Sequence, residues 1–118
     1  MSKPAAKYSL IRKAGNTYYV SGQVGFKRGT TELVSDDLQE QTVRVMENIV
    51  EILATEGLTL NDVVKTTVYL NDISYYAPVN KIYAEYITSN PPARAAFAVG
   101  ELPVNAKVEI EAIAYKES

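Results

Sequence analysis

Two opposite charges stand within segments of otherwise apolar character near the end of the chain. Arg94 is flanked by small residues in the stretch PPARAAFAV, and Glu109 lies between two aliphatic residues in KVEIEAIAY. A guanidinium presents a planar set of donors that binds a carboxylate bidentately. A glutamate in a partly desolvated site can hold or activate a water molecule. Together, these two residue types would suit a hydrolytic reaction on a small carboxylic acid.

The same residues also fit a purely structural interpretation. Arg94 could be a surface residue on an edge strand, and Glu109 and Glu111 could form the polar side of an alternating strand. Composition does not reject this interpretation, and spacing along the chain does not place Arg94 near Glu109. At this point both interpretations stand.

Composition limits the classes of protein that the chain can belong to. The 118 residues suit one compact domain, and an apolar fraction of 47% allows an ordinary core. Lys and Arg number 12 against 14 Asp and Glu, which is unlike the basic surface of nucleic-acid-binding proteins. Neither a membrane-spanning stretch nor a hydrophobic signal segment is evident in the sequence. We therefore expect a cytoplasmic chain whose mature form begins at MSKPAAKYS, with neither nucleic acid nor membrane as a partner.

The sequence contains neither Cys nor His. This absence removes disulfides, thiolate nucleophiles, imidazole bases and nearly all zinc sites. The carboxylates form no dense cluster of the kind that binds hard cations, so we predict no metal site. A Gly-rich nucleotide-binding motif is also lacking. Catalysis would therefore depend on Arg, carboxylates, Tyr, Ser, Lys or backbone groups.

Two further features have alternative interpretations. The nine tyrosines could stack on single-stranded nucleic acid, but no basic stripe accompanies them, so sheet faces and subunit contacts are the favoured use. Lys65 could form a Schiff base, yet it stands among β-branched residues with nothing evident to lower its pKa. A structural or exposed role is favoured for Lys65.

The first half of the chain predicts a hairpin and a helix. Residues 10–24 read as two strands joined by a tight turn at 14–16, where Gly and Asn accept positive φ. After a loop, Ser35 is the expected N-cap of a helix with an apolar face of helical period. Asp36 and Asp37 follow at the start of the helix, where the helix dipole favours negative charge, and Gly57 is the expected C-terminal cap.

The second half predicts a strand, a shorter helix and two final strands. The β-branched run VVKTTVYLND indicates the strand, and the helix follows in APVNKIYAEYITS with Pro78 in its first turn. The order strand, strand, helix, strand, helix, strand, strand predicts an α+β fold, a single mixed sheet with two helices packed on one face. The uncovered face would be buried against other copies, so we expect a homo-oligomer.

The sequence resembles the Rid family, the reactive-intermediate enamine/imine deaminases, also called YjgF or endoribonuclease L-PSP. The family signature near the C-terminus stands here as PARAAFAVGEL, PVNAK and VEI in succession. The segments YYVSGQVG, VVKTTVYLND and VNKIYAEYI also match, so the resemblance covers almost the whole chain. The separation of Tyr8 from Ser21 along the chain is the one that the family shows between its active-site tyrosine and serine.

The resemblance implies that residues 1–118 form a single Rid-like domain with a chorismate-mutase-like fold. It implies a homotrimer with a site in each intersubunit cleft. Arg94 would bind the substrate carboxylate, Glu109 would position the hydrolytic water, and Tyr8 would complete the catalytic set. The substrate-binding residues would be Ser21, Gly22, Arg94 and Asn80, with Asn80 in a supporting role.

The activity implied is hydrolysis of 2-aminoacrylate and related enamines, through their imine tautomers, to 2-oxo acids and ammonia. An imine carbon is already electrophilic, so neither a covalent nucleophile nor a cofactor is needed. The chain departs from the family pattern at Ala6-Lys7, where Gly-Pro is usual, at Ala96, where some members have Cys, and at Pro91, in place of a common aromatic. Two alternatives follow: a regulatory protein that binds small carboxylates without catalysis, and a single-strand ribonuclease.

Overall fold

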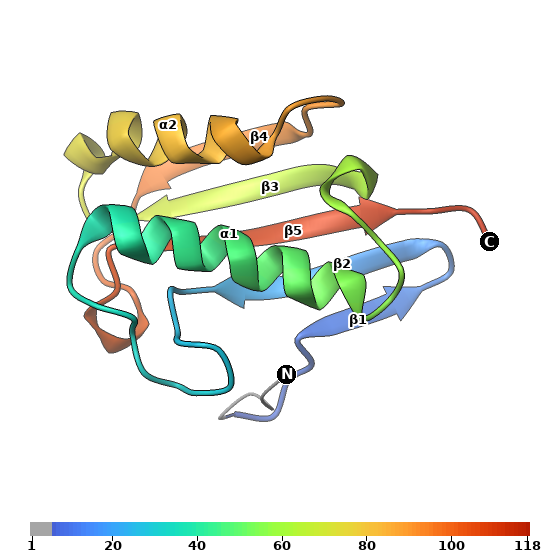
Figure 1. The fold of residues 1–118 in the computed structure, drawn as a ribbon, viewed down its shortest axis with the longest axis horizontal. Helices are drawn as coiled ribbons and strands as arrows, with labels where there is room; N and C mark the ends of the chain where they lie inside the picture. The colour runs from blue at the N-terminus through green and yellow to red at the C-terminus, as the bar shows by residue number, and fades with distance from the viewer. Residues whose placement is uncertain (1–5) are drawn as a thin grey trace.

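The computed structural model describes residues 6–118, which form one five-stranded mixed sheet with both helices on the same face (Figure 1). The sheet order is β1-β2-β5-β3-β4. The elements in chain order are β1 (Ile11–Ala14), β2 (Thr17–Gln23), α1 (Leu38–Ala54), β3 (Val63–Leu70), α2 (Tyr76–Tyr86), β4 (Ala93–Ala98) and β5 (Val108–Tyr115). The predicted α+β class and the predicted order of elements are confirmed.

Strand β4 differs from the others because its sole pairing, with β3, is the one parallel pairing in the described sheet. Parallel neighbours require a crossover connection, and α2 provides it between β3 and β4. Strand β4 is also an edge strand. The crossover places α2 against one face of β4, and Arg94 lies on that face.

The core forms where alternating strand residues meet the apolar face of α1. In β5, Val108, Ile110 and Ala112 are buried, whereas Glu109 and Glu111 alternate with them and point to the uncovered face. From α1 the core receives residues at helical spacing: Val45, Met46, Ile49, Ile52 and Leu53. The predicted alternation in β5 and the predicted apolar face of the helix are confirmed.

The start of α1 differs from the prediction by two residues. Asp37, not Ser35, is the N-cap, and its Oδ2 accepts a hydrogen bond of 2.8 Å from the backbone N–H of Glu40. The Ser35 hydroxyl instead accepts from the N–H of Asp37, so it stabilises the turn before the helix. At the other end Thr55 is the C-cap, and Gly57, with φ of +73°, follows it by two positions.

The predicted tight turn and the predicted place of Pro78 are confirmed, whereas the second helix ends at Tyr86, before the predicted Ser89. A two-residue turn, Gly15-Asn16, joins β1 to β2, with Ala14 paired to Thr17. Pro78 is the third residue of α2, within the first turn, where helix N–H groups have no intrahelical acceptor. These local signals depend on one or two residues each, which is why sequence alone identifies them.

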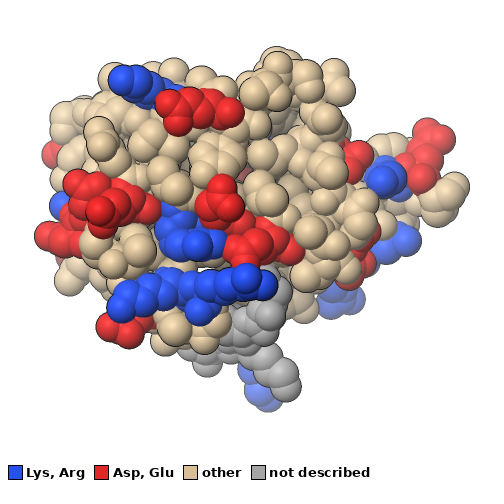
Figure 2. Space-filling view, viewed as in Figure 1, with Lys and Arg blue, Asp and Glu red and all other residues tan. Residues whose placement is uncertain are grey.

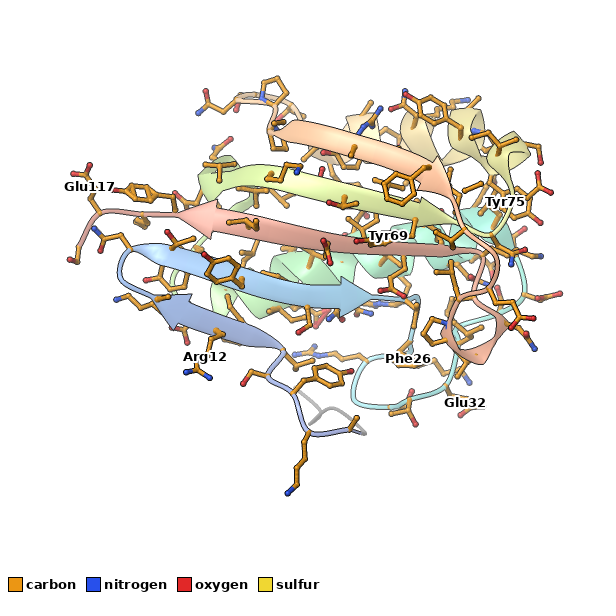
Figure 3. The ribbon with its side chains drawn as sticks, turned by 180° about the vertical axis from the view of Figure 1, so that it is seen from behind. Arg12, Phe26, Glu32, Tyr69, Tyr75 and Glu117 are labelled. Atoms are coloured by element: carbon orange, nitrogen blue, oxygen red, sulfur yellow. The ribbon has the colours of Figure 1, made fainter. Side chains whose placement is uncertain are left out.

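The uncovered face of the sheet displays aromatic and acidic side chains (Figure 3). Tyr69 and Phe97 stand edge to face on neighbouring strands, with ring centroids 5.4 Å apart. Tyr19 and Phe97 are both exposed large side chains. An exposed sheet face of this composition is suited to contact with another protein surface.

The helix-covered side of the molecule has a different surface. Lys, Arg, Asp and Glu side chains are intermixed on the face drawn in Figure 2. Within residues 6–118, no helix is both long enough and apolar enough to cross a membrane.

Candidate functional site

The pairing of β2 with β5 is irregular where Ser21 and Gly22 stand. Val20 pairs with Ala112, but Gln23 pairs with Ile110, so β2 has an extra residue at this point. Such irregularities bend a strand and re-aim side chains near functional sites. A Cβ built on Gly22 would lie 2.1 Å from Oε2 of Glu109. Only glycine therefore leaves room for the Glu109 carboxylate over the β2 backbone.

The environment of Glu109 raises its pKa above the usual value for a glutamate. Desolvation is the larger cause, because the half-buried carboxylate has lost part of its water. The second cause is repulsion by Glu111, which lies two residues along the same face of β5. A carboxylate with a raised pKa is a better proton acceptor, which suits the activation of a water molecule.

Ser21 fastens the segment that contains Tyr8. The Ser21 hydroxyl donates to the carbonyl oxygen of Ser9 at 2.6 Å, and the Ser21 N–H donates to the carbonyl of Leu10 at 3.0 Å. Because its proton is already used, the hydroxyl oxygen can only accept from a ligand. Ser21 therefore acts in this structure as the anchor of the wall formed by Tyr8.

A cavity of about 760 Å³ brings together four of the six predicted site residues: Tyr8, Ser21, Gly22 and Glu109. We call it the Glu109 cavity. Its other walls come from the loop of residues 24–31, from α1, and from Pro103 and Val104 in the loop before β5. Its volume is within the range of ordinary small-molecule sites. The sequence prediction that these four residues lie together is consistent with this arrangement.

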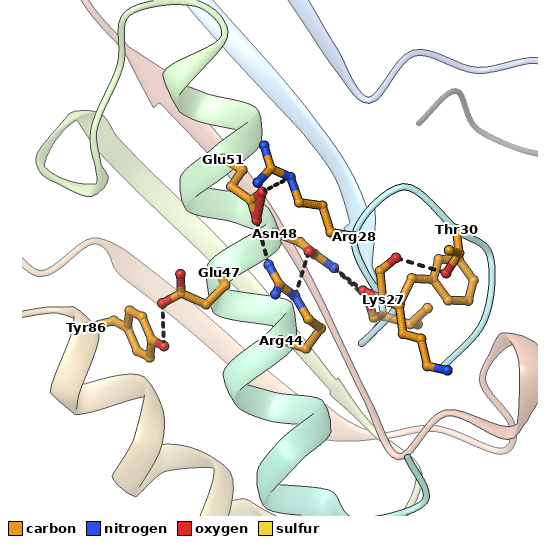
Figure 4. Close-up of polar contacts among 10 residues, drawn as sticks. Lys27, Arg28, Thr30, Arg44, Glu47, Asn48, Glu51 and Tyr86 are labelled. Atoms are coloured by element: carbon orange, nitrogen blue, oxygen red, sulfur yellow. Dashed lines mark hydrogen bonds and ion pairs between the residues drawn. The ribbon is translucent and has the colours of Figure 1, made fainter. Parts of the chain in front are cut away.

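The loop of residues 24–31 is held against α1 by polar contacts (Figure 4). The Asn48 amide donates to the carbonyl of Phe26 at 3.1 Å. Glu51 forms ion pairs with Arg44 on the same helix and with Arg28 of the loop, with 2.9 Å between Oε1 and the Arg28 Nε. These contacts attach the outer wall of the Glu109 cavity to the most buried helix of the fold.

Arg94 lies in a second, separate group of residues on α2 and β4. Its Nη1 donates to Oδ1 of Asn80 at 2.6 Å, and its Nη2 donates to the hydroxyl of Tyr76 at 2.8 Å. The guanidinium carbon lies 4.9 Å from the ring centroid of Tyr83 and 5.6 Å from that of Tyr76. We call Tyr76, Asn80 and Tyr83 the Arg94 cradle. The sequence prediction named both Asn80 and Arg94 as substrate-binding residues, with Asn80 in a supporting role, and the structure places the two in direct contact.

One chain does not bring Arg94 to Glu109. Tyr69 pairs with Glu109 on one side and with Phe97 on the other, so β5 and β4 lie two strand spacings apart, about 10 Å. Arg94 also contacts α2, on the helix-covered face, whereas Glu109 points to the uncovered face. Any site that uses both groups must therefore combine Arg94 of one copy with Glu109 of another.

Three residues of this second group did not emerge from the sequence: Tyr76, Tyr83 and Thr66. The two tyrosines stand with Asn80 at helical spacing on one face of α2. Thr66 pairs with Arg94 across β3 and β4, and its hydroxyl contacts that of Tyr83 at 2.8 Å. The helical spacing of these residues was visible in the sequence, but the sequence did not reveal that this face of the helix contacts Arg94.

Other chemistry-bearing residues lie elsewhere. Lys65 lines a smaller cavity of about 410 Å³ on the sheet, together with Arg12 and Glu111, and is absent from the lining of the Glu109 cavity. Within residues 6–118, no three or more His, Cys, Asp and Glu side chains are grouped so as to hold a metal ion.

Comparison with known proteins identifies the family. The sequence model of the family described as Endoribonuclease L-PSP matches residues 1–116, so the chain belongs to this family, the Rid or YjgF family. The predicted family is thus confirmed.

Individual relatives agree with this assignment. A RutC family protein from Pyrococcus horikoshii is 48% identical over 98% of this chain and 91% of its own length. The human 2-iminobutanoate/2-iminopropanoate deaminase is 43% identical over 91% of this chain and 78% of its own length. Among solved structures, E. coli TdcF with bound serine has a TM-score of 0.91 at 29% identity, covering 98% of this chain and 93% of that one.

Proposed function

We propose that the protein hydrolyses 2-iminopropanoate and related 2-imino acids, the tautomers of 2-aminoacrylate and similar enamines, to 2-oxo acids and ammonia. The observation that carries the proposal is the half-buried Glu109 carboxylate, with its raised pKa, beside Gly22 in the Glu109 cavity. The human relative named for this activity, at 43% identity, supports it.

In the proposed reaction the Glu109 carboxylate accepts a proton from water as the water oxygen attacks the imine carbon. The carbon–oxygen bond forms while the electron pair of the C=N bond moves to nitrogen, which takes up a proton. The carbon–nitrogen bond of the resulting tetrahedral carbinolamine then breaks: the nitrogen takes back the proton held by Glu109 and leaves as ammonia, while the hydroxyl group loses its proton to solvent and becomes the carbonyl of the 2-oxo acid. Arg94 binds the carboxylate of the substrate throughout, because its planar donors match two carboxylate oxygens. Tyr8, Ser21 and Gly22 line the space around the reacting carbon.

We further propose that the complete site lies between copies, in a homotrimer with one site in each intersubunit cleft. The separation of Arg94 from Glu109 within one chain supports this arrangement, since both groups are needed for the reaction. The exposed aromatic side chains of the uncovered sheet face, Tyr19 and Phe97, provide apolar surface for such contacts.

The first experiment compares wild type with Arg94→Ala. 2-Aminoacrylate is generated in situ by a dehydratase, and the formation of pyruvate is followed. Loss of a bidentate contact to the carboxylate should lower the rate by about 10²- to 10³-fold. Arg12→Ala is the matched control, because Arg12 lies on β1 and lines the smaller cavity instead. Equal rates for wild type and Arg94→Ala reject the proposed role of Arg94.

A second experiment tests the shared site. Arg94→Ala and Glu109→Gln are each slower than wild type by a factor of about 10² or more in this proposal. Mixed oligomers, in contrast, contain clefts that unite an intact Arg94 with an intact Glu109. Random mixing should restore about a quarter of the wild-type sites. Unfolding and refolding the two variants together, with separately refolded variants as controls, measures this recovery. Failure to recover activity in mixed oligomers contradicts the shared site.

A carboxylate-binding protein without catalysis is the second candidate. It is favoured by Ala6-Lys7 before Tyr8, a departure from the family pattern at one wall of the Glu109 cavity. The serine bound in the TdcF structure shows that a relative holds a small carboxylate. Binding of a 2-oxo acid without any acceleration of imine hydrolysis supports this candidate. Ribonuclease activity, which the family description names, is tested in parallel with labelled single-stranded RNA.

A further inference from the structure

The Arg94 guanidinium is attached to α2 at both of its terminal nitrogens. Nη1 donates to Asn80 at 2.6 Å and Nη2 donates to the Tyr76 hydroxyl at 2.8 Å. One hydrogen bond would leave a planar group free to rotate about the bond that joins it to the side chain. Two bonds to different nitrogens fix both the position and the tilt of the plane.

A rigid aromatic surface lies beneath the same group. The guanidinium carbon of Arg94 is 4.9 Å from the ring centroid of Tyr83, a distance typical of cation–π contact. Tyr83 is buried, and its hydroxyl shares a 2.8 Å hydrogen bond with the buried hydroxyl of Thr66. Since Thr66 is also the strand partner of Arg94, the strand pair that carries the cation also holds the ring in place.

Tyr76 is itself held in position by the start of α2. It is the first residue of the helix and follows the 3₁₀ turn Ile73–Tyr75. Asp72 caps that turn by accepting from the N–H of Ser74 at 2.9 Å. Tyr76, Asn80 and Tyr83 then fall on one helix face, four and three residues apart. The phenol, the amide and the second ring therefore approach Arg94 from a single element.

An arginine side chain has five N–H donors, and two are used by the Arg94 cradle, which leaves three for a ligand. We infer that Tyr76 is a positioning residue. Its hydroxyl, together with the Tyr83 ring that Thr66 holds in place, fixes the Arg94 guanidinium in the orientation that binds a substrate carboxylate. This inference rests on the role of Arg94 in the proposed function.

The exposure of Tyr76 separates this role from a structural one. The residue is 41% exposed, so its hydroxyl is not a buried group that folding must satisfy. Replacing Tyr76 by Phe removes one oxygen and keeps the ring over the guanidinium. Stability should therefore be unchanged, while the freedom of Arg94 increases.

The test compares Tyr76→Phe with wild type in turnover and in binding. Imine hydrolysis gives kcat and KM, and calorimetry gives the affinities for pyruvate and for its neutral amide. We expect kcat/KM to fall about tenfold, mainly through KM, and the Kd for pyruvate to rise by a similar factor. Affinity for the amide should be unchanged. Tyr115→Phe is the matched control, because Tyr115 is 43% exposed and lies at the far end of β5.

Each outcome decides a different point. Unchanged kcat/KM and unchanged pyruvate affinity in Tyr76→Phe overturn the inference. If wild type fails to hydrolyse the imine but Tyr76→Phe still weakens pyruvate binding, the proposed function fails and the positioning role stands. If Arg94→Ala binds pyruvate as well as wild type does, Arg94 is not the carboxylate ligand, and the inference is overturned with it.

Discussion

The surroundings of Glu109 and of Arg94 are built on opposite principles. The half-buried Glu109 carboxylate lies over Gly22, which has no side chain to exclude it. Both burial and the neighbouring Glu111 carboxylate favour the neutral form of Glu109. Arg94 is held by two hydrogen bonds and two aromatic rings. The acid is thus kept ready to take a proton, whereas the cation is kept in one place. A group that reacts benefits from an unsatisfied environment, and a group that only binds benefits from a rigid one.

The largest expected effect comes from removing the reactive group itself. Glu109→Gln keeps the shape of the side chain but cannot accept a proton, so kcat for imine hydrolysis should fall by about 10²- to 10⁴-fold. Affinity for pyruvate should stay near the wild-type value, because Arg94 is untouched. A stopped assay for kcat and calorimetry for pyruvate separate the two effects. Retention of kcat in this variant would show that another group activates the water.

The next effect comes from filling the space that Gly22 leaves. In Gly22→Ala the new methyl group would clash with the Glu109 carboxylate, because its carbon would lie 2.1 Å from Oε2. The flexible end of the Glu109 side chain would therefore move. A displacement of about 1 Å at a reacting group can cost about 10² in rate. The protein should still fold, which circular dichroism verifies. Gly100→Ala is the control, because a Cβ there meets nothing within 4 Å. Wild-type turnover in Gly22→Ala would mean that the position of Glu109 is unimportant.

A smaller effect concerns pH. Only the ionised form of Glu109 accepts a proton, so kcat/KM should decline as the pH falls through a pKa that is raised above the usual value for a glutamate. Glu111→Gln removes the repulsive part of the shift but leaves desolvation, its larger cause. The acidic limb should therefore move to lower pH by less than the whole shift. A pH–rate profile measures this, with Glu117→Gln as the control. A limb that does not move would rule out Glu111 as a contributor.

The smallest effect on rate is expected from breaking the hydrogen bond between Thr66 and Tyr83, which lie next to Arg94. This change acts mainly on the stability of the fold. Thr66→Val leaves the Tyr83 hydroxyl buried without its partner, so the free energy of unfolding should fall by about 1–3 kcal/mol. Adding Tyr83→Phe removes the stranded hydroxyl, and the double variant should lose less than the sum of the two single losses. Urea denaturation measures all three variants. Additive losses would show that the two hydroxyl groups do not depend on each other.

Local patterns made the elements predictable, and strand order limited the prediction of the site. The alternation around Glu109 identified both β5 and the direction of its acidic side chains. The face on which Arg94 lies could not be deduced, because it depends on the parallel pairing of β4 with β3 and on the crossover through α2. The N-cap was misassigned to Ser35 because Ser and Asp both cap helices well, and only backbone geometry distinguishes Asp37.

The two hydrogen bonds from Ser21 to the segment after Tyr8 have a practical consequence for handling the protein. An affinity tag or fusion partner joined at the amino terminus would pull on a wall of the Glu109 cavity that these two hydrogen bonds help to hold. The carboxyl terminus is the safer attachment point, because Tyr115 pairs with Thr17 beside the β1–β2 turn, at the opposite end of β2 from Gly22 (Figure 1).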